Sequence, residues 1–129
     1  MKDLRLEVLL QPIGLTEQYI NDEQEKGDFL IGAFEGEQMV GCCVLTPKEH
    51  GSIQLRQMAV SKSVQGKGIG AAIVAFAEKL AAENGFSLLL MHARNEVMEF
   101  YAKSGYQVEG REFMEAGIGH HRMQKRLKE

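Results

Sequence analysis

Apolar residues along this chain of 129 residues recur at spacings typical of strands and helices, most clearly in its middle third. Residues 53–60 carry apolar side chains at alternating positions, with a shift of phase after Leu55, and predict a strand. Residues 68–84 predict a helix, because their large apolar residues lie at helical spacing: Ile69, Ile73, Phe76 and Leu80. Residues 86–92 form a continuous apolar run, which favours a buried strand parallel to the first and joined to it by a right-handed crossover.

Shorter periodic runs flank this strand–helix–strand unit. Further strands are predicted at residues 4–10, 29–34, 39–45, 106–114 and 118–127, and further helices at residues 15–26 and 95–103. Glycine in the turn between the second and third strands favours a hairpin there. We therefore expect a single mixed α/β domain of α+β-like character over residues 1–129, with one antiparallel half, one parallel step and a terminal hairpin.

Composition and charge restrict the class of protein. The chain is 44% hydrophobic with a net charge of −3, which is ordinary for a globular domain and argues against nucleic acid as a partner. No apolar run reaches the ~18 residues that a membrane span requires, and the first residues lack the apolar segment of a signal peptide. Cys42 and Cys43 are adjacent, so a disulfide between them is disfavoured and a reducing, cytoplasmic location is expected. No Cys/His spacing indicates a metal site.

A glycine-rich turn, Gln65-x-x-Gly68-x-Gly70, leads into the central helix. The first N–H groups of a helix have no intrahelical partner, and together with the helix dipole they bind anions; glycine lets a phosphate approach the backbone closely. Ala71 stands where a P-loop would have lysine, so that motif is not supported. Taken alone, the turn fits phosphate binding and a tightly packed helix start equally well.

A second motif, Phe100-Tyr101-x-x-x-Gly105-Tyr106, follows the parallel strand. Together with Met58-Ala59-Val60 and the glycine turn, it resembles the GNAT superfamily of acyl-CoA-dependent N-acetyltransferases. The C-terminal Gly119-His120-x-x-Met123 resembles the last strand of small bacterial members. The resemblance covers roughly residues 29–127.

The resemblance implies a central twisted mixed sheet of about seven strands, mostly antiparallel, with helices on both faces. It implies that the strands at 53–60 and 86–92 splay apart beyond a bulge, with residues 89–92 as the opposite wall of a slot. Acetyl-CoA would be the acyl donor: its pantetheine arm would pair with the free strand edge, and the glycine turn would hold its pyrophosphate. The implied cofactor-binding residues are Met58, Ala59, Val60, Gln65, Gly66, Lys67, Gly68, Ile69, Gly70, Arg94, Asn95 and Tyr101. Arg94 stands where many relatives have a cofactor-contacting asparagine, with Asn95 beside it, so which of the two makes this contact stays open.

The chemistry that the resemblance implies is direct transfer of an acetyl group from a thioester to a primary amine. By its place in the motif, Tyr101 resembles the family's general acid. Many relatives carry a glutamate that acts as the general base on the strand before the bulge. Here Gln54 and Arg56 occupy that region, and neither is a plausible base. His92, at the end of the parallel strand, and His120, on the last strand, are the candidate bases, and a water chain to solvent is the alternative.

The missing glutamate also leaves a second reading, a non-catalytic acyl-CoA-binding sensor or regulatory module; a nucleotide-binding domain is a third. For an enzyme, the acceptor would be a small-molecule or peptide amine. The short helical segment at residues 15–26 suggests an open acceptor cleft, which the partner subunit of a homodimer would complete. Acidic residues favour a cationic acceptor or simply form a solvated surface: Glu17, Glu23, Glu25, Glu35 and Glu37.

Overall fold

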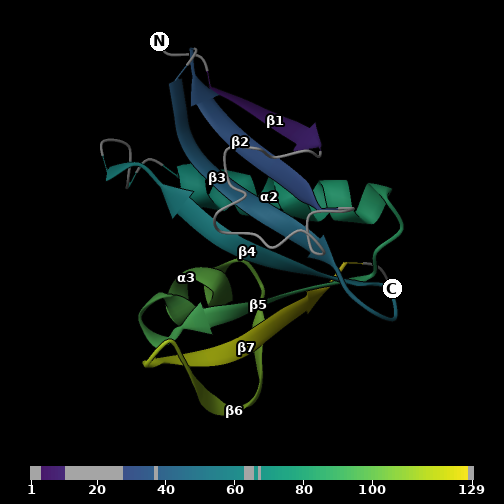
Figure 1. The fold of residues 1–129 in the computed structure, drawn as a ribbon, viewed down its shortest axis with the longest axis vertical. Helices are drawn as coiled ribbons and strands as arrows, with labels where there is room; N and C mark the ends of the chain where they lie inside the picture. The colour runs from purple at the N-terminus through teal and green to yellow at the C-terminus, as the bar shows by residue number, and fades with distance from the viewer. Residues whose placement is uncertain (1–3, 11–27, 37, 63–65, 67, 128–129) are drawn as a thin grey trace.

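The computed structural model describes residues 4–10, 28–36, 38–62, 66 and 68–127, which form a sheet with helices packed against it (Figure 1). The strands are β1 (Leu4–Leu10), β2 (Phe29–Glu35), β3 (Gln38–Pro47), β4 (Ser52–Val60), β5 (Leu88–Arg94), β6 (Gln107–Glu115) and β7 (Ile118–Arg126). The helices are α2 (Ile69–Glu83), the short 3-10 helix η3 (Asn95–Val97) and α3 (Met98–Lys103). No helix in these ranges is both long and apolar enough to cross a membrane.

The sheet has seven strands in the order β1-β2-β3-β4-β5-β7-β6. All neighbouring strands are antiparallel except β4 and β5, which are parallel and connected through α2. The prediction of a mostly antiparallel mixed sheet with one parallel step and a terminal hairpin is confirmed.

The bounds of most predicted elements differ by one or two residues from the observed ones, and two differences bear on the site. The strand predicted at 86–92 is β5, which begins and ends two residues later, because the first two residues of that run belong to the turn: Phe86 N–H bonds to Ala81 and Ser87 N–H to Gly51. The helix predicted at 95–103 is divided into η3 and α3. The helix predicted at 15–26 lies outside the described residues.

Helix α2 packs against β2, β3 and β4 with a stripe of buried residues, namely Ile69, Ile73, Val74, Ala77 and Ala81. The close approach requires Gly41 of β3, because a Cβ there would lie 2.8 Å from Ile73 Cδ1. Helix α3 meets α2 where Gly70 faces the ring of Phe100, 3.1 Å from the place a Cβ would occupy. Both helices join one core cluster, whereas Leu30 and Val44 form a separate one.

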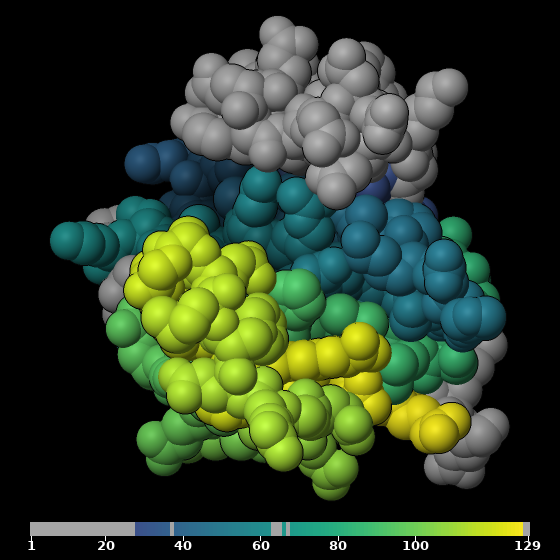
Figure 2. All heavy atoms as spheres, turned by 60° about the horizontal axis from the view of Figure 1, so that its bottom comes forward, coloured from purple at the N-terminus to yellow at the C-terminus, as the bar shows by residue number. Residues whose placement is uncertain are grey.

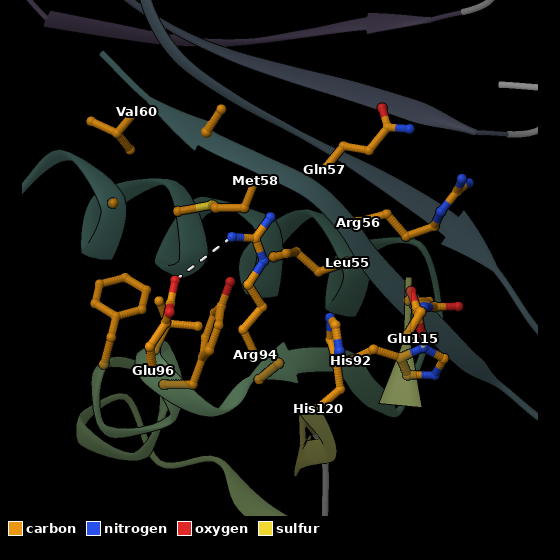
Figure 3. A pocket seen from close by; sticks show the side chains of 17 residues that line it. Leu55, Arg56, Gln57, Met58, Val60, His92, Arg94, Glu96, Glu115 and His120 are labelled. Carbon is orange, nitrogen blue, oxygen red and sulfur yellow. Dashed lines mark hydrogen bonds and ion pairs between the residues drawn. The ribbon is translucent and has the colours of Figure 1, made fainter. Parts of the chain in front are cut away.

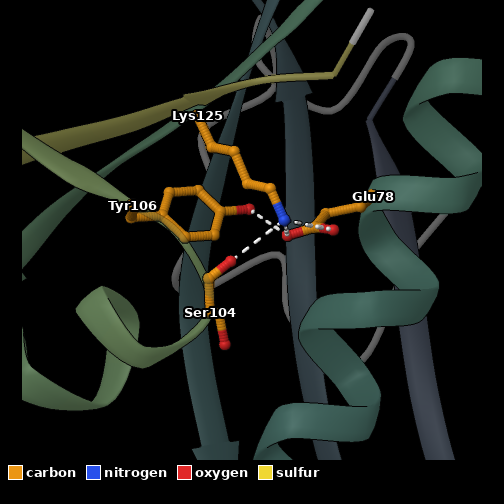
Figure 4. Close-up of polar contacts among 4 residues, drawn as sticks. All are labelled: Glu78, Ser104, Tyr106 and Lys125. Atoms are coloured by element: carbon orange, nitrogen blue, oxygen red, sulfur yellow. Dashed lines mark hydrogen bonds and ion pairs between the residues drawn. The ribbon is translucent and has the colours of Figure 1, made fainter.

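A half-buried polar cluster ties α2 to the C-terminal part of the sheet (Figure 4). The Tyr106 hydroxyl donates to Glu78 Oε2 at 2.9 Å, and Lys125 Nζ donates to Glu78 Oε1 at 3.1 Å and to the Ser104 carbonyl at 2.9 Å. Burial, and the adjacent Glu78 carboxylate, raise the pKa of Tyr106 far above its ordinary value. The phenol therefore stays protonated and serves as a permanent donor in this cluster.

We expect Tyr106→Phe to lower the free energy of unfolding by roughly 1.5 kcal/mol, since it removes a half-buried hydrogen bond to a carboxylate while the ring stays in place. Urea denaturation would measure the change. The matched control is Tyr101→Phe, because the Tyr101 hydroxyl bonds to no described residue; we expect that change to stay within about 0.5 kcal/mol. Equal losses in the two variants would contradict a specific role for the Tyr106–Glu78 bond.

Candidate active site

Strand β4 contains a bulge at Gln57 and Met58, which together stand opposite the single residue Cys43 of β3. Gln57 adopts a left-handed backbone conformation with φ of 54°, which costs a residue with a side chain about 1–2 kcal/mol. A bulge bends its strand and increases the local twist. It also moves the strand's apolar positions out of phase, which accounts for the shift after Leu55 in the sequence.

Beyond the bulge, β4 and β5 separate. Their parallel pairing is limited to three residue pairs: Ser52 with Leu88, Ile53 with Leu89, and Gln54 with Leu90. A cavity of about 800 Å³ opens between the two strands past that point (Figure 3). The expected splayed pair is confirmed, but the expected opposite wall at residues 89–92 is partly wrong, because Leu89 and Leu90 pair with β4 inside the sheet. The wall of the cavity is His92–Arg94.

Several parts of the chain surround this cavity, Gly70 of α2 among them. Residues 54–60 of β4 form one wall and His92–Arg94 of β5 the other, while η3 with α3 and the β6–β7 hairpin close its two ends. In the space-filling view, yellow-green residues of the hairpin lie next to teal residues of the chain near β4 (Figure 2). Predicted site residues that line the cavity are Met58, Ala59, Val60, Gly70, His92, Arg94, Tyr101 and His120.

Other predicted cofactor contacts lie elsewhere. Gly66 and Gly68 are exposed in the turn before α2, while the Ile69 side chain is 4% exposed and packs in the core, so only its backbone can meet a ligand. Gln65 and Lys67 lie outside the described residues. The cavity and the glycine turn are thus joined through Gly70, which lines the one and follows the other.

The start of α2 is built to leave its amide groups open. Gly66 and Gly68 have φ of 86° and 82°, which favour glycine, and Gly68 is the N-cap of α2. It provides no side-chain cap, and the described first turn carries no acidic residue. Within the part of the chain that the structure describes, no side chain caps the first amides of this helix, which is what an anion site requires.

Tyr101 is 6% exposed and lies at the α3 end of the cavity. Its ring contacts those of Phe100, at a centroid distance of 5.0 Å, and Tyr106, at 6.1 Å. Burial, with a smaller contribution from the Cys43 thiol, raises the pKa of Tyr101 to about 12. Its hydroxyl makes no hydrogen bond to a described residue, so at neutral pH it is a protonated donor available to a ligand.

The opposite end of the cavity holds two histidines around one aromatic ring. The Phe113 ring meets His92 edge-on at a centroid distance of 5.1 Å and stacks on His120 at 5.8 Å. His92 Nδ1 lies 3.0 Å from Glu115 Oε1, and His120 Nδ1 lies 2.8 Å from the Ile118 carbonyl oxygen. Because a carbonyl oxygen and a carboxylate only accept, both imidazoles carry their neutral-state hydrogen on Nδ1 and leave Nε2 as the basic nitrogen.

Glu115 is a cavity-lining residue that the sequence interpretation missed, because it was assigned to the turn between the last two strands. The structure makes it the last residue of β6, closed by a two-residue turn in which Ala116 and Gly117 have φ of 54° and 76°. This turn type gives the hairpin a defined register, with Glu115 opposite Ile118. The signal was available in the Ala-Gly pair flanked by two alternating runs.

Arg94 and Asn95, the two candidates for one cofactor contact, have different surroundings. Arg94 lines the cavity and lies 3.6 Å from a carboxylate oxygen of Glu96. The Asn95 amide donates to Glu112 at 2.7 Å, and its oxygen accepts from His121 Nδ1 at 2.8 Å. The Asn95 side chain thus ties η3 to the β6–β7 hairpin, and Arg94 is the one that faces the cavity.

Comparison with known proteins agrees with this architecture. Residues 5–127 match the acetyltransferase (GNAT) domain family. The chain is 33% identical over 123 residues to the uncharacterized N-acetyltransferase YjcF of Bacillus subtilis, covering 95% of this chain and 87% of that protein. Its fold is similar to that of a Lactobacillus plantarum protein proposed to be an N-acetyltransferase, with a TM-score of 0.84, 17% identity and coverage of 96% and 98%.

A GNAT family acetyltransferase of Elizabethkingia anophelis, whose crystal structure has acetyl-CoA bound, is similar with a TM-score of 0.73, 18% identity and coverage of 94% of both chains. The match over nearly the whole chain, the relative at 33% identity and the splayed parallel pair agree with one another. This chain belongs to the GNAT acetyltransferase family.

Proposed function

We propose that this protein transfers an acetyl group from acetyl-CoA directly to a primary amine of a small molecule or peptide. The observation that carries the proposal is the single cavity between β4 and β5, which has Tyr101 at one end, His92 and His120 at the other, and the open start of α2 beside it. Acyl transfer needs a hydrogen-bond or proton donor for the leaving thiolate and a base for the attacking amine. The cavity offers the two on opposite sides.

The described residues fit acetyl-CoA as the acyl donor. Beyond Gln54, the β4 edge that faces β5 has no strand partner among the described residues, so its backbone can pair with the amides of a pantetheine arm. The uncapped first turn of α2 and the positive φ of Gly68 suit a pyrophosphate. When bound, acetyl-CoA supplies an activated acyl group on a thioester. The acetyl-CoA seen in the Elizabethkingia anophelis relative is consistent with this assignment.

The residues of the chain would handle the protons of the reaction. An alkylammonium ion carries three N–H bonds and the product amide one, so two protons leave the nitrogen. A base in the cavity takes the first, and the free lone pair then forms the new C–N bond as the C–S bond breaks. The sulfur gains one proton and solvent receives the other, which balances the reaction.

Tyr101 would act on the sulfur side. A thiol has an ordinary pKa of about 8.5, whereas the pKa of Tyr101 is raised to about 12. The phenol holds its proton more tightly than the thiol does, so Tyr101 stabilises the departing thiolate chiefly as a hydrogen-bond donor. His92 and His120 are the described bases that line the same cavity.

Isothermal titration with acetyl-CoA, followed by a CoA-release assay over a panel of amines, amino acids and peptides, tests the proposal. We expect binding at micromolar to low millimolar concentration and turnover with at least one amine. Absence of binding at millimolar acetyl-CoA would overturn it. Binding without turnover on any acceptor would favour the acyl-CoA sensor instead.

We expect Gly68→Ala to weaken CoA binding about tenfold, which corresponds to about 1.4 kcal/mol. A Cβ at φ of 82° forces the turn to rearrange and moves the first amides of α2 away from the pyrophosphate. Gly85→Ala is the matched control, since Gly85 has φ of 89° at the other end of the same helix and also has open space around it. Both variants should lose similar stability in urea, and only Gly68→Ala should change the Kd measured by titration. Equal Kd values would show that the start of α2 does not hold the cofactor.

We expect Tyr101→Phe to lower kcat about a hundredfold, since the loss of one positioned hydrogen-bond donor to a developing negative charge costs at least that much. Acetyl-CoA affinity should stay within about twofold, because the ring and its contacts remain. Tyr106→Phe is the control: it should lower the stability of the protein but leave kcat unchanged. A parallel fall in affinity and kcat for Tyr101→Phe would mark Tyr101 as a packing residue.

A further inference from the structure

We propose that His92 is the general base of this enzyme and that Glu115, on the neighbouring hairpin, is its positioning residue. The proposal rests on the proposed acetyl transfer, and it assigns to Glu115 a role that fixes which nitrogen of His92 faces the acceptor amine. Figure 3 shows both side chains at the same end of the cavity, reached from different strands.

The His92 ring is held from two sides. Glu115 Oε1 accepts from Nδ1 at 3.0 Å, and the Phe113 ring stands almost perpendicular to the imidazole, with an interplanar angle of 79°. Among the described residues no hydrogen bond involves Nε2 of His92, and the side chain lines the cavity. The imidazole therefore has one nitrogen fixed by a carboxylate and the other open to a ligand, which is the arrangement that a general base needs.

The geometry of β5 places the His92 side chain on the face of the sheet that borders the cavity. On β5, Leu89, Met91 and Ala93 are buried in the core shared with α2, so the alternating residues His92 and Arg94 project from the opposite face. The final hairpin brings Glu115 to that same face, because its register is fixed by the two-residue turn. Two segments far apart in the chain thus build one pair of side chains.

His120 is less suited to the same task. Its Nδ1 donates to the neutral carbonyl of Ile118, and its ring is 7% exposed and stacked on Phe113. A base becomes positively charged when it takes a proton, and a buried positive charge without an anionic partner is costly. His92 has that partner in Glu115, whereas no carboxylate among the described residues hydrogen-bonds to His120.

The contact between His92 and Glu115 contributes little to the stability of the fold. Its main effect is on the chemistry of the His92 ring. The side chains of His92 and Glu115 are 37% and 52% exposed, and exposed pairs of this kind contribute about 0–1 kcal/mol to stability. Such a contact can still select one of the two imidazole tautomers, because the hydrogen bond that one ring nitrogen makes sets which nitrogen carries the hydrogen.

The proton transfer balances with the acetyl transfer. His92 Nε2 takes one proton from the ammonium group of the acceptor and becomes an imidazolium, whose charge the Glu115 carboxylate offsets. The neutral amine attacks the thioester carbonyl, and the imidazolium returns its proton to solvent after the C–S bond has broken. The second proton from the nitrogen accounts for the one that the sulfur gains.

The test uses the full-length protein and the variants Glu115→Gln, His92→Gln and the double variant, with Glu109→Gln as the control. Glu109 is exposed on the same strand, where it pairs with Arg122 through the backbone, and its side chain hydrogen-bonds to no described residue. We expect Glu115→Gln to lower kcat about tenfold or more, with the Kd for acetyl-CoA unchanged, and His92→Gln about a hundredfold. The double variant should be no slower than His92→Gln alone, since a positioning residue has no effect without the base. Glu109→Gln should behave as wild type.

A second readout is independent of turnover. Nitrogen-15 NMR of the imidazoles in the free protein reports which ring nitrogen carries hydrogen. We expect His92 to be in the Nδ1–H form in wild type and in Glu109→Gln, and to lose that preference in Glu115→Ala, which removes the acceptor altogether, whereas the amide oxygen of Glu115→Gln can still accept from Nδ1–H. Wild-type kcat in Glu115→Gln together with an unchanged tautomer in Glu115→Ala would overturn the proposal, as would fully additive losses in the double variant. Either result leaves acetyl-CoA binding by the wild type intact, so it is distinct from failure of the proposed acetyl transfer.

Discussion

The arrangement of this molecule depends on a hydrogen-bonding constraint: β4 and β5 pair over three residue pairs and then part. The left-handed Gln57 and the bulge that it forms turn β4 away before the parallel ladder can continue. Backbone strain of this kind persists where the surrounding structure holds it, and here α2 and β3 hold both sides of β4. The parted strands leave unpaired backbone and a cavity in the middle of a sheet that is otherwise continuous.

Alternating side chains along each strand point to opposite faces of the sheet, which separates the core residues from the residues that line the cavity. The same β5 that sends Met91 into the core sends His92 into the cavity, and β7 divides Met123 and His120 in the same way. The two tyrosines that surround Ser104 divide their roles similarly. Tyr106 is bonded to Glu78 and stabilises the junction of α2 with the C-terminal strands, whereas the hydroxyl of Tyr101 has no bond to a described residue and faces the cavity.

Periodicity and short motifs were enough to predict most of the fold. The strand at 53–60, the helix that follows and the terminal hairpin were visible as alternating or helical spacing, and the glycine turn with Tyr101 indicated the family. Sequence reasoning could not assign what depends on pairing between distant segments. Glu115 was predicted to lie in the turn, and only the hairpin register places it beside His92. The choice between Arg94 and Asn95 as the cofactor contact stayed open, because the bonds of Asn95 to Glu112 and His121 could not be predicted from the sequence. The bulge left one trace, the phase shift after Leu55, but a glutamine has no preference that would locate it.

The turn at Ala116 and Gly117 has a consequence for how this enzyme can change over evolutionary time. Surface turns are where chains ordinarily accept insertions, since lengthening a loop costs little free energy. A two-residue turn that sets the register of Glu115, the proposed positioning residue of His92, does not have that freedom. One added residue that shifted the pairing of β6 with β7 would turn Glu115 to the opposite face of the sheet. If the proposed acetyl transfer holds, new acceptor preferences are therefore more accessible through side-chain replacement on the strands than through remodelling of this loop.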